Sequence, residues 1–87
     1  MTKKEIVKAM LDAVLEAEAR TGGQIWFETI PHVDSVRVHT VDTKRYPTDG
    51  GDYEVVNLLD MTEPTEEALD ALRWRLLPEN LRKVWTR

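Results

Sequence analysis

The sequence predicts a single small α+β domain over residues 1–87. In this domain a helix precedes a three-stranded antiparallel sheet, one or two C-terminal helices follow, and the order α-β-β-β-α-α forms two layers. Apolar residues recur at helical spacing near both ends of the chain. Segments rich in β-branched and aromatic residues, which are typical of strands, lie between them. A length of 87 residues is enough for one domain and too short for two.

The first helix is predicted from residue 2. Thr2 and Glu5 have the spacing of a capping box, and Gly22-Gly23 ends the helix because a left-handed residue closes the last turn at low cost. Its apolar stripe is Ile6, Met10, Ala13, Val14 and Ala17, widened by Val7, Leu11 and Leu15. Lys4 and Lys8 form an unfavourable like-charge pair on the wet side.

Three strands are expected over residues 24–30, 35–42 and 53–59. The second strand alternates, and it places Val36, Val38 and Thr40 on one face and Arg37, His39 and Val41 on the other. Residues 31–34 form a turn, and residues 43–51 form a polar loop that is longer than a tight hairpin requires. The Val and Leu doublets of the third strand predict that both sheet faces are partly covered.

The C-terminal region predicts a helix over residues 62–77 and a short helix over residues 79–85. Thr62 or Thr65 caps the first of these helices, Pro64 lies in its first turn, and Pro78 breaks or kinks it. Its core stripe is Ala68, Leu69, Leu72 and Leu76. The anchors of the last helix are Leu81, Val84 and Trp85.

This order of elements, over about residues 2–76, resembles that of double-stranded-RNA-binding domains. The resemblance implies a lysine-rich patch at the start of the second helix, where such domains meet phosphates. Residues 62–67 read Thr-Glu-Pro-Thr-Glu-Glu at that position, so their charge is opposite to the one that a phosphate backbone requires. The resemblance therefore covers element order alone and assigns no site residue.

The composition excludes several classes of function. The chain has no cysteine, which excludes disulfides, thiol catalysis and Cys-based zinc sites and favours a reducing compartment, the cytoplasm. Acidic and basic residues interrupt the apolar positions near the N-terminus, and no apolar run approaches a membrane span. A net charge of −4, from 16 acidic and 12 basic residues, opposes general binding to nucleic acid.

No reactive group has the surroundings of a catalytic or metal site. His32 and His39 lie near Asp34 and Asp42, but their spacing matches no metal motif, so the surface-histidine interpretation is preferred. Asp49 and Asp52 flank Gly50-Gly51 and are typical of a turn. Ser35 is the only serine and has no nucleophile motif around it. We therefore expect no enzyme, no cofactor and no metal.

The leading hypothesis is a protein-binding module, such as an inhibitor, adaptor or accessory factor. Either Trp26-Glu28-Ile30 or Ile25-Phe27-Thr29 must point away from the helices and leave an aromatic residue near the surface. The predicted protein-binding residues are Trp26, Arg37, His39, Lys44, Arg45 and Tyr46. Replacing both Arg45 and Tyr46 by alanine is expected to weaken binding without unfolding. A homodimer through the same face stays open as an alternative, and an origin in a phage or mobile element is a hypothesis from size.

The alternative hypothesis is nucleic-acid binding through the C-terminal helices. The residues proposed for it are Arg73, Arg75, Arg82, Lys83 and Arg87, which are interspersed with Trp74 and Trp85. The competing structural interpretation is that both tryptophans are core anchors and that the basic residues complement helix ends.

Overall fold

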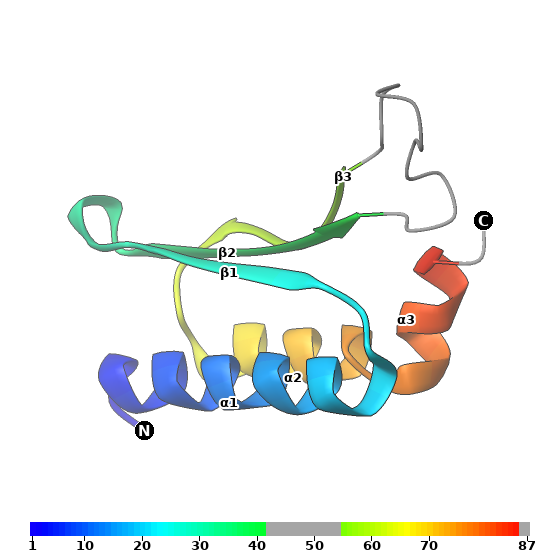
Figure 1. The fold of residues 1–87 in the computed structure, drawn as a ribbon. Coiled ribbons are helices and arrows are strands. Elements are labelled where there is room, and N and C mark those ends of the chain that lie inside the picture. Colours follow the sequence, from blue (N-terminus) through cyan, green and yellow to red (C-terminus); the bar gives the residue numbers. More distant parts are fainter. Residues whose placement is uncertain (42–54, 86–87) are drawn as a thin grey trace.

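A computed structural model describes residues 1–41 and 55–85 and confirms the predicted fold class. Helix α1 (Lys3–Thr21) leads into strands β1 (Ile25–Ile30), β2 (Ser35–Val41) and β3 (Val55–Thr62). Helices α2 (Glu66–Arg75) and α3 (Pro78–Trp85) follow. The antiparallel sheet has the order β1-β2-β3, and α1 and α2 lie side by side beneath it as a second layer (Figure 1). The predicted loop and residues 86–87 lie outside the described residues.

Helix α1 begins and ends as predicted. The Thr2 side chain accepts a hydrogen bond of 3.2 Å from the Glu5 backbone, and the Glu5 carboxylate accepts one of 3.0 Å from the Thr2 backbone. Gly22 closes the last turn with a φ of 72°. The buried residues are Ile6, Met10, Val14 and Ala17. Leu11 and Leu15 do not widen this core as predicted, because the sheet covers only the stripe, and they are 41% and 53% exposed.

Strands β1 and β2 form a hairpin through a 3₁₀ turn at Pro31–Val33. Asp34 completes this turn in the left-handed conformation, with a φ of 52°, as its short polar side chain permits. Strand β2 alternates as predicted from Val36 to Thr40, because Val36, Val38 and Thr40 are fully buried between the layers. Val41, predicted on the other face, is buried as well.

Strand β3 corrects one prediction about the sheet. Leu58 and Leu59 are both buried, but the reason is a bulge and not a cover over each face of the sheet. The register with β2 shifts twice, between Val36 and Val38 and between Val38 and His39. Because a bulge adds a residue to one strand, two consecutive side chains turn toward the same core.

The start of α2 also differs from the prediction. Residues 60–62 continue β3, so the helix begins at Glu66 with Thr65 as its N-cap. The Thr65 hydroxyl accepts a hydrogen bond of 3.1 Å from the Ala68 backbone. Pro64 therefore precedes the helix and is buried, whereas Thr62 belongs to the sheet. At the other end Pro78 separates the two helices as predicted and becomes the first residue of α3.

Candidate functional site

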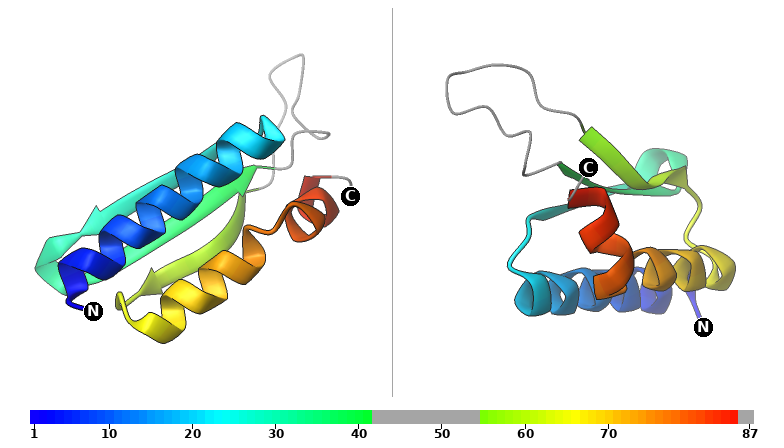
Figure 2. Two further views of the ribbon diagram at one scale, coloured as in Figure 1. Left: turned by 90° about the horizontal axis from the view of Figure 1, so that it is seen from below. Right: turned by 90° about the vertical axis from the view of Figure 1, so that its right-hand side faces the viewer.

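The face of the sheet opposite the helices has no element of the described chain upon it (Figure 2). Ile25 is buried, so its neighbours Trp26 and Glu28 project from the other side of β1. Arg37 and His39 project from the same side of β2. The structure therefore decides between the two faces that the sequence left open, and Trp26 is the exposed aromatic residue.

The open face carries a stacked pair of rings near the start of β1. Trp26 lies opposite His39 in the β1–β2 register, and the two rings are 5.4 Å apart with only 6° between their planes. Asn57 lies opposite His39 on β3 and extends this row across the sheet. The stack fixes the orientation of an indole that is 41% exposed, so its apolar area is presented to solvent in one geometry.

A shallow hollow adjoins the stack. Trp26, His39, Val41 and Val55 line it, and its volume is about 220 Å³. Val41 and Val55 pair across β2 and β3 at the end of the sheet, where Val41 is buried and Val55 is 50% exposed. Val41, Val55 and Asn57 are not among the residues that the sequence predicted for the site. Val41 lies on the face predicted for it with Arg37 and His39, whereas the place of Val55 and Asn57 depends on the β2–β3 register, which sequence patterns alone do not fix.

An ion pair stands beside the stack on the same face. Arg37 Nη2 donates to Glu28 Oε2 at 2.8 Å, and the two residues face each other in the β1–β2 register. The Arg37 Nε–H is buried and has no hydrogen-bond acceptor. Both side chains are more than a third exposed, so the pair contributes little to stability and an incoming carboxylate can compete with Glu28 for the guanidinium.

The area of the open face limits what it can do alone. Strands of six to eight residues, spaced about 4.8 Å apart with about 3.3 Å per residue, span a face of about 300 Å². A standard stable interface buries about 800 Å² on each partner. The face therefore has the size of an interaction hot spot, and a tight complex must also use neighbouring surfaces.

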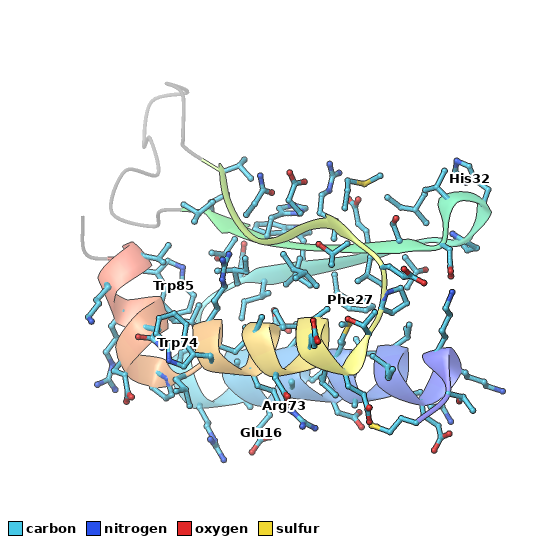
Figure 3. All side chains as sticks on the ribbon, turned by 180° about the vertical axis from the view of Figure 1, so that it is seen from behind. Glu16, Phe27, His32, Arg73, Trp74 and Trp85 are labelled. Atoms are coloured by element: carbon cyan, nitrogen blue, oxygen red, sulfur yellow. The ribbon has the colours of Figure 1, made fainter. Side chains whose placement is uncertain are left out.

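Four of the predicted site residues lie outside the described residues, and the basic residue Arg73 lies away from the sheet. These four are Lys44, Arg45, Tyr46 and Arg87. Arg73 shares a hollow with Glu16 and Arg20 between α1 and α2, on the side of the helical layer away from the sheet (Figure 3).

The remaining predicted basic residues lie elsewhere. Arg75 donates from Nη1 to the Leu58 carbonyl oxygen of β3 at 2.9 Å, and Lys83 and Arg82 are exposed on α3. The described members of the basic set thus do not form one continuous stripe.

The two C-terminal tryptophans differ in burial, which corrects the view of both as core anchors. Trp85 is 8% exposed and packs beneath the sheet, whereas Trp74 is 62% exposed (Figure 3). The helical spacing could have predicted that Trp74 is exposed. Trp74 is two residues from both Leu72 and Leu76 and therefore lies on the opposite side of α2 from these core leucines. With Arg75, Lys83 and Val84, Trp74 lines a groove of about 260 Å³ next to β3.

The two histidines occupy separate places. His32 lies at the tip of the β1–β2 turn (Figure 3), whereas His39 is stacked on Trp26. Within residues 1–41 and 55–85, no three His, Asp or Glu side chains gather in a way that would hold a metal ion. None of the three described helices is both long and apolar enough to cross a membrane.

Comparisons with protein-family models, with curated proteins and with solved structures found no match for this chain.

Proposed function

We propose that this protein is a small non-enzymatic module that binds another protein through the open face of its sheet. The observation that supports this is the Trp26–His39 stack, which presents a half-exposed indole beside Arg37 on a face without helices. Trp and Arg are the residues most enriched at interaction hot spots. A fixed indole also loses little conformational entropy when a partner covers it.

The chemistry of the face indicates the kind of partner surface that fits it. The hollow beside Trp26 has room for one aliphatic or aromatic side chain, and Arg37 offers a guanidinium within reach of an acidic neighbour. The partner surface therefore presents an apolar side chain next to a carboxylate. That carboxylate would replace Glu28 on Arg37 and give the buried Nε–H an acceptor.

Site-specific crosslinking tests this proposal. A photoreactive amino acid at Asn57 samples the edge of the open face and also the adjoining Trp74 groove, which the tryptophan variants below distinguish. The same group at Asp12, exposed on α1, samples the other side of the molecule. In lysate of the encoding organism, we expect one protein to be captured from position 57, with or without nuclease, and not from position 12. The purified captured protein is then titrated against Trp26→Ser, with Trp74→Ser as the matched control, because both tryptophans are exposed.

The expected result is binding weakened at least about tenfold by Trp26→Ser and unchanged by Trp74→Ser. If Trp26→Ser and Trp74→Ser bind the captured protein equally well, the open face is not the binding site. A crosslink between two copies of the chain at position 57, together with a dimer in sedimentation analysis, would show instead that the face joins two protomers.

A second candidate function, nucleic-acid binding, is favoured by one observation. Trp74 is exposed in a groove with Lys83 and Arg75, and an aromatic surface beside cations suits the stacking of an unpaired base. Single-stranded oligonucleotides should then bind with an affinity that falls steeply as salt rises, and Trp74→Ser should weaken them. An affinity that does not change with salt concentration would eliminate this candidate.

A further inference from the structure

A hollow of about 500 Å³ is lined by residues from the first turns of α1 and from the β1–β2 turn. These segments lie at the other end of the molecule from α3 (Figure 1). Val7, Pro31 and Pro64 contribute its apolar surface, and Val7 packs directly on the core. Lys3, Lys4 and Lys8 of α1 line it as well. Its volume falls within the range of about 300–1,000 Å³ that is typical of sites for small organic ligands.

The charges around this hollow do not balance. Lys3 forms ion pairs with Asp34, which also lines the hollow, and with Glu63 at 3.0 Å. Lys4 and Lys8 have no such partner among the ion pairs of residues 1–41 and 55–85. They lie one helical turn apart, a spacing at which like charges destabilise a helix. An anion placed between them would remove this repulsion.

The apolar surface continues from the hollow along α1. Lys4, Lys8, Leu11 and Leu15 follow one another at spacings of four, three and four residues, so all four lie on one flank of the helix. Helix α2 runs along the opposite flank, where Glu16 and Arg20 share a hollow with Arg73 (Figure 2). The two leucines are half-exposed, so the lysine pair stands at one end of an uncovered apolar strip.

We propose that this hollow binds a small amphipathic anion, a carboxylate or phosphate monoester that carries an apolar body. The ammonium groups of Lys4 and Lys8 hold the anionic group, and the body lies against Val7 and extends toward Leu11. An apolar lining with a few convergent polar groups is the usual character of small-molecule sites. This site is separate from the open sheet face and does not depend on a partner protein.

Titration of the full chain with decanoate, followed by the backbone amide signals in NMR, tests the proposal. We expect saturable binding with a dissociation constant on the order of 1 mM, because a ligand of about twelve heavy atoms can gain only a modest binding free energy. The shifts should centre on residues 3–8 and 29–35. Decanol, acetate and inorganic phosphate serve as the other probes. Each lacks either the charge or the apolar body, so each should bind at least roughly fivefold more weakly.

Replacing the lysine pair completes the test. Lys4→Gln with Lys8→Gln should weaken decanoate roughly fivefold or more, whereas Lys83→Gln, on α3, should not. The double variant should also be at least as thermostable as the parent, because it removes a like-charge pair, so its loss of binding would not reflect unfolding. The proposal is wrong if decanol binds as well as decanoate, if phosphate alone suffices, or if the shifts centre elsewhere. It is equally wrong if a short acidic peptide binds the same amides more tightly, since the occupant would then be a polypeptide.

Discussion

Trp85 donates its indole Nε1–H to the hydroxyl oxygen of Thr40 at 3.1 Å, across 45 residues of sequence. The same hydroxyl donates to the Gln24 carbonyl oxygen at 2.6 Å. Thr40 is fully buried, and Trp85 is nearly so. This chain of two hydrogen bonds joins α3, the central strand and the connection between α1 and β1, and each buried polar group along it has a partner.

We expect Thr40→Val to destabilise the protein by about 1–3 kcal/mol, because it keeps the shape and leaves the buried indole N–H without an acceptor. Urea unfolding measures the change, and Thr29→Val at an exposed position is the control. Combination with Trp85→Phe tests the pairing directly. If the effects of the two substitutions simply add, the hydrogen bond does not contribute.

Gly23→Ala should cost about 1–3 kcal/mol through overpacking. A Cβ at this position would lie 2.2 Å from the Trp85 ring, which rests against the backbone there. Gly22→Ala is the matched comparison, because its neighbourhood is open and its cost comes only from a φ of 72°. In a Trp85→Leu background the Gly23→Ala cost should shrink and the Gly22→Ala cost should persist. Equal costs in both backgrounds would show that the ring is not the obstacle.

The two C-terminal tryptophans should differ sharply in their effect on stability. Trp85→Ala is expected to cost about 3–5 kcal/mol, because it opens a large cavity and removes the anchor of α3. Trp74→Ala should change the free energy of unfolding by no more than about 0.5 kcal/mol, because its side chain is largely in solvent. Thermal unfolding of the two variants, followed by far-UV circular dichroism, checks this. A large loss of stability in Trp74→Ala would contradict its exposed position.

The contribution of Lys3 to stability should depend on pH at the alkaline end. Hydrogen bonds to Asp34 and then to Glu63 raise the pKa of Lys3 above its ordinary value of 10.5. Because the folded state holds this proton more tightly, the stabilisation is complete below that value and is lost as pH rises through the raised pKa. The stability difference between the parent and Lys3→Gln should therefore stay constant from about pH 7 to about pH 9 and narrow as pH rises above 10.5. Lys4→Gln, which replaces a lysine without these partners, is the control. A difference that does not narrow would show that the ion pairs are not formed in solution.

Local patterns identified those parts of the fold that local interactions decide. The capping box at Thr2 and Glu5, the left-handed Gly22 and the break at Pro78 act within one or two turns, and each stands where it was predicted. The start of α2 was misplaced because Thr62 and Thr65 are both competent caps. Thr62 pairs with Val36 and therefore belongs to β3. Local propensity cannot predict this, because it does not include pairing between strands.

The sequence by itself determined the class of the fold, the buried stripe of each main helix without the flanking Leu11 and Leu15, the alternation of β2 from Val36 to Thr40, and the absence of cysteine chemistry. Each of these follows from spacing or composition. Only the tertiary structure decided that α1 and α2 lie under the sheet face that carries Ile25 and Val38 (Figure 1). Trp26 and His39 are therefore stacked on the other face. It likewise buried Trp85, exposed Trp74 and placed Lys4 and Lys8 beside the β1–β2 turn. These outcomes depend on contacts between segments far apart in the chain, because an alternating strand has two equivalent faces until a helix covers one of them.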